Sequence, residues 1–120
     1  MKDPVEAITE MIVLIENGTV PGSINRKMVM EHGLWNLGHL MFAGQKGAVA
    51  VHYGRDWAGW GSMEESIEGI RRDVRAKARR GMTLSEIITQ YAPPTENNTA
   101  SYISTIVSAT GLDPNQSIKI

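Results

Sequence analysis

Four segments of the chain begin with a helix-capping residue and continue with apolar residues at helical spacing, and this pattern predicts a mainly helical fold. The caps are Asp3, Ser62, Thr83 and either Asn98 or Thr99. At the first cap, Pro4 takes the first helical position and Glu6 lies three residues further on, as in a capping box. Glycines at positions 18, 81 and 111 end the first, second and fourth helices.

Each predicted helix has one apolar stripe, which we expect to face the core. In the first helix the stripe is Val5, Ile8, Met11, Ile12 and Ile15, and in the second it is Met63, Ile67, Ile70 and Val74. In the third it is Leu84, Ile87 and Ile88, and in the fourth Tyr102, Ile103, Ile106 and Val107.

The segment between the first two of these helices is less regular. Within it, "SINRKMVMEH" predicts a short helix, and "AVAVHYGRDWAGW" predicts a hairpin with Val49, Val51 and Tyr53 alternating before a turn near Gly54-Arg55-Asp56. The tail "LDPNQSIKI" is expected to be extended and to lie on the surface. The fold class is therefore α+β, mainly α, as one domain over residues 1–120 with a small irregular or hairpin insertion.

Composition limits the size of the core and the kinds of site and partner that the protein can have. A chain of 120 residues with 42% hydrophobic residues supports one modest core, and a net charge of −1 argues against gross attraction to nucleic acid or membrane. The absence of cysteine excludes disulfides and thiolate metal sites. The longest apolar run, "MIVLI", is too short for membrane insertion, and the acidic start "MKDPVEAITE" predicts that no signal peptide is present.

The C-terminal stretch "YAPPTENNTASYISTIVSATGLDPNQSI" resembles the end of a family of small phage and prophage proteins. These are peptidoglycan hydrolases or virion structural proteins with a lysozyme-like fold. The matching residues are Tyr91, Ala92, Pro93, Pro94, Glu96, Asn97, Thr99, Tyr102, Ile103 and Gly111. Upstream, "GWGSMEESIEGIRRDV" and "GQKGA" also resemble family segments, so the resemblance runs from about Gly33 to the C-terminus.

The central family motif is altered in this chain. The family has Gly-Ile-Arg-Asn-Asn-Asn-Pro-Gly-Asn-Ile where this chain has "GLWNLGHL". Leu37 stands in place of the proline and His39 in place of the last asparagine, while Asn36 and Gly38 remain. If this loop shapes the sugar cleft of the relatives, its alteration puts catalytic activity in question.

The resemblance implies two alternative functions. The first is a muramidase or lytic transglycosylase that cleaves peptidoglycan glycan strands without metal or organic cofactor. It would be made in the host cytoplasm and act in the virion or periplasm. The second is an inactive lysozyme-like phage protein, either a virion structural component or a binder or inhibitor of a host partner.

Glycosidic cleavage needs a carboxylic acid that holds its proton near neutral pH. Glu16 is the candidate, because it lies at the edge of the apolar stripe and at the negative C-terminal end of its helix, where the anionic form is disfavoured. Its context, "LIENGT", resembles the helix-end acid of lysozyme-like folds. The alternatives are that Glu16 is an ordinary solvated residue, or that Glu31 next to the altered motif carries the role.

Four other residues are candidates for substrate binding. Asn36 and His39 belong to the altered motif, and Trp35 adjoins it as a possible stacking platform, although the tryptophans also suit a core or lid. Tyr102 resembles a cleft-lining tyrosine of glucosaminidase relatives, and it also suits the core at helical spacing with Ile106.

The second predicted helix contains half of the chain's basic residues, in "RRDVRAKARR". Arg71, Arg72, Arg75 and Arg79 are candidates for binding an anionic partner, and the alternative is an ordinary solvated face. Histidines 32, 39 and 52 lack the spacing of metal ligands, so no metal site is predicted.

Overall fold

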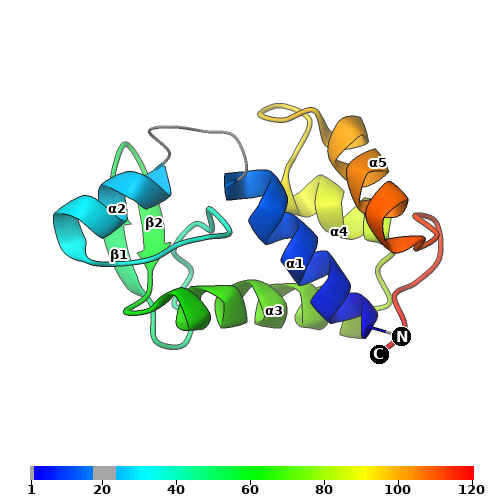
Figure 1. Cartoon of the computed structure of the whole chain (residues 1–120), viewed down its shortest axis with the longest axis horizontal. Helices are drawn as coiled ribbons and strands as arrows, with labels where there is room; N and C mark the ends of the chain where they lie inside the picture. Colours follow the sequence, from blue (N-terminus) through cyan, green and yellow to red (C-terminus); the bar gives the residue numbers. More distant parts are fainter. Residues whose placement is uncertain (1, 18–23) are drawn as a thin grey trace. The chain divides into compact units, whose positions relative to one another are not determined.

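The computed structural model describes residues 2–17 and 24–120, which form five helices and one two-stranded antiparallel sheet (Figure 1). The elements are α1 (Pro4–Asn17), α2 (Ile24–His32), β1 (Val49–His52), β2 (Asp56–Gly59), α3 (Met63–Arg79), α4 (Leu84–Tyr91) and α5 (Thr99–Thr110). The prediction of a mainly helical chain with a small hairpin is confirmed. Gly18, the predicted end of the first helix, lies outside the described residues.

The chain divides into two units. Unit 1 consists of residues 1–11 and 71–120, and unit 2 of residues 12–70. The boundaries fall inside α1 and α3, so each of these helices contributes residues to both units.

In unit 1, the ends of α4 and α5 follow from local sequence. Thr83 and Glu86 form a reciprocal capping box at the start of α4, and Asn98 caps α5 by accepting a hydrogen bond from the Ser101 amide. Gly111 ends α5 with a φ of 73°, a left-handed conformation that glycine adopts without steric cost. The predicted caps and inward-facing residues of α4 are thus confirmed.

The start of α1 agrees only in part with the prediction. The Asp3 carboxylate accepts a hydrogen bond from the Val5 amide, and Pro4 is the first helical residue. Both carboxylate oxygens of Glu6, however, accept from the Arg71 guanidinium of α3. The predicted capping role of Glu6 is therefore wrong, because a cation within reach is a stronger partner than a backbone amide.

The C-terminal tail of unit 1, predicted to be extended, has a turn at residues 114–115, and Ser117 then pairs with Thr83 at the start of α4. The Ile118 amide donates to the Met82 carbonyl, and the Ser117 hydroxyl donates to the Gly81 carbonyl. Ile118 is buried, at 6% exposure. The predicted surface segment is thus held in place by its backbone and by one apolar side chain.

In unit 2, α2 and the hairpin occupy the predicted segments. In the register of the hairpin, Val51 is opposite Trp57 and Val49 is opposite Gly59. Val51 is buried, whereas Val49 is 51% exposed. The expected burial along the alternation fails at Val49 because its cross-strand partner has no side chain to pack against.

Trp60 forms part of the buried core of unit 2. It is 1% exposed, and its indole N–H donates to the Lys46 carbonyl at 3.0 Å. A side-chain carbon at Gly69 of α3 would lie 2.5 Å from the Trp60 ring, so this helical position requires glycine. Met63, expected in the core, is 44% exposed at the first turn of the same helix.

Candidate functional site

The central feature of unit 2 is a contact between an acid and a histidine. Glu16 lies one residue before the end of α1, and its Oε1 is 2.8 Å from Nδ1 of His39. The side chains are only 17% and 18% exposed, respectively. The two groups form a partly buried acid–base pair, in which the charge on the imidazole depends on protonation.

The backbone at His39 has an unusual conformation. Its φ is 51°, and among the described residues it is the only non-glycine residue with a positive φ. A non-glycine residue in this region costs about 1 to 3 kcal/mol and persists only when its surroundings hold it there. Other residues must therefore hold the loop around His39 in this conformation.

Three asparagines, Asn17, Asn25 and Asn36, form an asparagine cluster that fixes this loop. The Asn17 amide group donates to the carbonyls of Val13 and Leu37, at 2.8 and 2.6 Å. The Asn25 side chain donates to that of Asn17 at 3.4 Å and accepts from the Asn36 backbone N–H at 2.9 Å. The cluster therefore ties the end of α1 and the start of α2 to the loop.

Asn36 closes the loop from within. Its side chain donates to the Leu40 carbonyl at 2.8 Å and accepts from the Leu40 amide at 2.9 Å. Between these two residues, the His39 amide donates to the Asn36 carbonyl. Asn36 is fully buried, and its contact with substrate stays a prediction. Its hydrogen bonds serve the backbone that positions His39.

An aromatic side chain of the hairpin adjoins the pair. The ring of Trp57 meets that of His39 edge-on, with centroids 6.5 Å apart and planes at 75°. The Arg55 guanidinium lies over the Trp57 ring at 5.7 Å. Sequence reasoning favoured Trp35 as the aromatic neighbour of the site and did not single out Trp57. The register of the hairpin in the structure identifies Trp57, because it lies opposite the buried Val51.

The other predicted aromatic residues have different surroundings. The backbone of Trp35 pairs with that of Trp60, and the Trp35 side chain is partly exposed. Tyr102 belongs to unit 1 and is 6% exposed, which favours the core role that its spacing also allowed. Burial, followed by the nearby Glu31 carboxylate, raises the pKa of Tyr53 above its ordinary value of 10.0, so its hydroxyl stays protonated at neutral pH.

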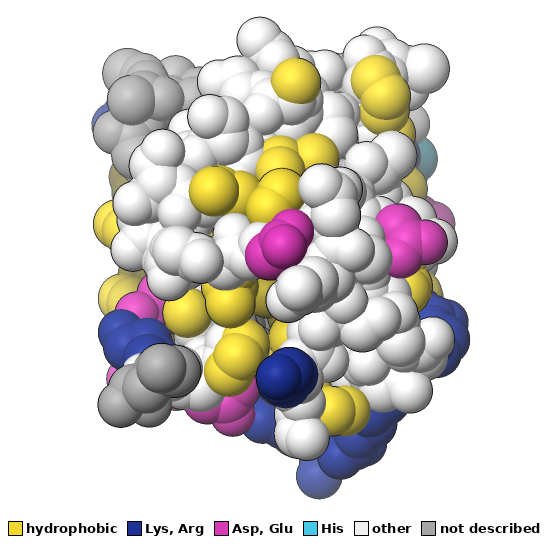
Figure 2. All heavy atoms as spheres, turned by 90° about the vertical axis from the view of Figure 1, so that its right-hand side faces the viewer, with side chains coloured by type: hydrophobic (Ala, Val, Ile, Leu, Met, Phe, Trp, Pro, Cys, Tyr) yellow, Lys and Arg dark blue, Asp and Glu magenta, His cyan; other side chains and the backbone are white. Residues whose placement is uncertain are grey.

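The basic residues of α3 divide by their surroundings. Arg71 forms a two-pronged ion pair with Glu6, and this hydrogen-bonded guanidinium holds the pKa of Glu6 below its ordinary value, against the opposing effect of burial. Arg71 is therefore an internal ion-pair partner in unit 1, and its role toward an external anion stays a prediction. Arg72 and Arg79 are exposed and Arg75 is partly exposed. Figure 2 shows Lys and Arg side chains gathered along the lower edge of the face that it presents.

Residues 2–17 and 24–120 contain no group of three or more His, Asp or Glu side chains that could hold a metal ion. Among their helices, none is both long and apolar enough to span a lipid bilayer.

Comparison of the chain with protein-family models, curated proteins and solved structures gives no match. A partly buried carboxyl group hydrogen-bonded to an imidazole is equipped for proton transfer, since one group can hold a proton while the other stabilises the charge that its loss creates.

Proposed function

We propose that the chain is a lysozyme-like glycosidase that cleaves the glycan strands of peptidoglycan, with Glu16 as general acid and His39 as its positioning partner. The main support for the proposal is the 2.8 Å contact between the Glu16 side chain, near the end of α1, and the His39 side chain. The asparagine cluster holds the loop that contains His39. The resemblance of the sequence to small phage and prophage lysozyme-like proteins supports the choice of substrate.

The chemistry assigned to Glu16 is proton transfer at the glycosidic bond. His39 Nδ1 contacts Oε1 of the carboxyl group, and we assign the proton to the other oxygen, Oε2. Glu16 gives this proton to the leaving glycosidic oxygen as the bond to the anomeric carbon breaks. The carboxylate then takes a proton from the substrate's own hydroxyl group that attacks the same carbon, which restores the acid.

His39 has two tasks in this scheme. It fixes the orientation of the Glu16 carboxyl group, and its N–H stabilises the carboxylate that forms when the proton leaves. A single acid–base group suffices when the substrate supplies the attacking group, as in substrate-assisted glycosidases. The scheme therefore requires no second carboxylate.

Lysis of purified peptidoglycan tests the proposal. We expect wild-type protein to clear a peptidoglycan gel and Glu16→Gln to leave it intact, since glutamine keeps the hydrogen-bonding shape and has no acidic proton. Glu64→Gln, an exposed change in the first turn of α3, is the matched control and should clear the gel like wild type. Circular dichroism verifies that each variant is folded.

Absence of clearing by folded wild-type protein at every pH and salt concentration tried would refute the glycosidase. Clearing by Glu16→Gln would refute the assignment of the acid. His39→Gln, which keeps a hydrogen-bond donor for Glu16, should retain clearing, and His39→Leu, which has no donor, should lose it.

The second candidate is an inactive scaffold of the same kind that binds an anionic partner through α3. It is favoured by the exposed guanidinium groups of Arg72 and Arg79 on a helix that also holds Arg75. Binding of this kind weakens as salt rises, because it depends on charge. A gel-shift assay with a nucleic acid or an acidic cell-wall polymer tests it, and binding that is indifferent to salt would contradict it.

A further inference from the structure

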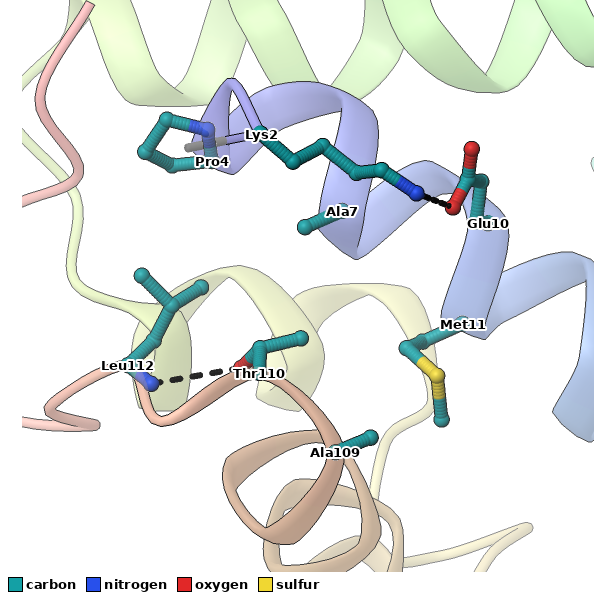
Figure 3. A pocket seen from close by; sticks show the side chains of 8 residues that line it. All are labelled: Lys2, Pro4, Ala7, Glu10, Met11, Ala109, Thr110 and Leu112. Carbon is teal, nitrogen blue, oxygen red and sulfur yellow. Dashed lines mark hydrogen bonds and ion pairs between the residues drawn. The ribbon is translucent and has the colours of Figure 1, made fainter.

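Unit 1 contains a groove that is separate from the residues assigned to catalysis. It has a volume of about 320 Å³ and is lined by Lys2, Pro4, Ala7, Glu10, Met11, Ala109, Thr110 and Leu112. Figure 3 shows side chains of α1 facing those from the end of α5 across this space. All the lining residues belong to unit 1. The groove is at the small end of the range for ligand sites, which fits a small molecule.

Most of the lining is apolar. Ala7 and Met11 of α1 lie across from Ala109 and Leu112 at the end of α5 (Figure 3). The alanines keep the groove open because their side chains are too short to fill it. Met11 was expected in the core and is instead partly exposed here, where its flexible thioether suits a variable apolar guest.

Among the described residues that line the groove, only Lys2 and Glu10 are charged, and they are paired with each other. Their side chains are 54% and 48% exposed, so the pair contributes at most about 1 kcal/mol and separates at little cost. A ligand with both charges would replace this single pair by two, its carboxylate on Lys2 and its ammonium on Glu10.

From this arrangement we propose that the groove binds a free α-amino acid with an apolar side chain, such as leucine or methionine. The ammonium of Lys2 and the carboxylate of Glu10 are adjacent, and in an α-amino acid the ammonium and the carboxylate are bonded to the same carbon. A longer zwitterion would separate its charges too widely. The apolar wall formed by Ala7, Met11 and Leu112 then receives the side chain.

Titration of the full chain with four probes, followed by amide chemical shifts, tests each part of the proposal. Leucine should shift the amides of Ala7, Met11, Ala109 and Leu112. Leucinamide lacks the carboxylate, 4-methylpentanoate lacks the ammonium, and glycine lacks the apolar side chain. Each should bind at least about tenfold more weakly than leucine, the effect of one lost charged or apolar contact.

Variants of the rim and wall give an independent check. Lys2→Gln and Glu10→Gln should each weaken leucine binding about tenfold, and Ala109→Leu should abolish it by filling the groove. Glu64→Gln in unit 2 should leave it unchanged. Ala109 is exposed, so its substitution should preserve the fold.

The proposal is overturned if leucine causes no shift at millimolar concentration. It is equally overturned if leucinamide or 4-methylpentanoate binds as well as leucine, or if Ala109→Leu binds like wild type. None of these results bears on Glu16, so this inference and the proposed glycosidase can fail separately.

Discussion

Two glutamates of the same helix, Glu6 and Glu16, have different basic partners. Glu6 in unit 1 holds Arg71 with both oxygens, at 2.6 and 2.9 Å, and this cation is charged at every accessible pH. Glu16 in unit 2 holds one nitrogen of His39, an imidazole that is a cation only when it is protonated. The first pair is suited to stability and the second to proton transfer, although both acids are carried by one regular helix.

The two units also differ in the interactions that stabilise their local structure. In unit 1, backbone caps and buried aliphatic side chains of α4 and α5 account for the local structure. In unit 2, a loop without regular structure is held by the side-chain amides of the asparagine cluster. Conformational strain is found at His39 of this loop, where a rigid setting is needed for a defined acid–base geometry.

The largest expected effect is on the rate of peptidoglycan lysis, which should depend on Glu16 and not on Glu6. Glu16→Gln should lower the rate of peptidoglycan lysis by about 100-fold to 10,000-fold, the contribution of a positioned general acid. Glu6→Gln should leave the rate per folded molecule near that of wild type, as measured by release of soluble fragments at neutral pH. Equal losses in both variants would remove the functional contrast between the two sites.

The next effect concerns the asparagine cluster. Asn36→Ala should lower the free energy of unfolding by about 1 to 3 kcal/mol, because it leaves the partly buried Leu40 amide without its partner and removes one of the two hydrogen bonds to the Leu40 carbonyl. Denaturant unfolding monitored by tryptophan fluorescence measures this loss.

Asn97→Ala is the matched control for Asn36→Ala. Asn97 is exposed and makes one long hydrogen bond of 3.4 Å to the Pro93 carbonyl, so its loss should cost less than about 0.5 kcal/mol. If the two substitutions lower the free energy of unfolding equally, the side-chain amide of Asn36 does not stabilise the loop of unit 2, contrary to what its hydrogen bonds indicate.

A smaller effect is expected at the ion pair of unit 1. Glu6→Gln should cost about 1 to 2 kcal/mol at neutral pH, since the pair is partly screened by solvent at 33% exposure of Glu6. Glu10→Gln on the same helix breaks only the exposed contact with Lys2 and should cost less than about 0.5 kcal/mol.

The pH dependence of this cost has a definite sign. Because Arg71 lowers the pKa of Glu6 in the folded state, the stabilisation is present above the ordinary value of 4.5 and is lost as pH falls through the lowered pKa. Wild type and Glu6→Gln should therefore converge in stability in acid. A difference that persists or grows below this range would contradict the ion pair as its cause.

The smallest effect is expected at a helix cap. Thr83→Ala removes the capping box of α4 and should cost about 1 kcal/mol in thermal or denaturant unfolding. Thr105→Ala, on the exposed side of α5, should cost less. If Thr83→Ala lowers the free energy of unfolding as much as Asn36→Ala does, the two units do not differ in the interactions that stabilise them.

Much of the secondary structure was predictable because its signals are local. The caps at Thr83 and Asn98, the glycine at 111 and the turn at Gly54 each act within one or two helical turns or a single hairpin. Glu6 was misassigned because its sequence position suits a cap equally well, and the competing cation is 65 residues away.

The candidate site was predictable only in part. Glu16 could be singled out because a helix end and the edge of an apolar stripe are visible in sequence. Its contact with His39, 23 residues away, could not, and neither could the neighbouring Trp57. Asn36 was recognised as part of a motif, but whether its amide group faces a ligand or the backbone depends on the folded loop.

The sequence by itself determined where helices and turns begin and end, since those choices depend on neighbouring residues and on hydrophobic spacing. Only the tertiary structure decided the partners of the charged and amide groups: Arg71 for Glu6, His39 for Glu16 and the loop backbone for Asn36. The physical reason is that the strength of a polar contact depends on distance and burial, and both are set by residues far apart in the chain.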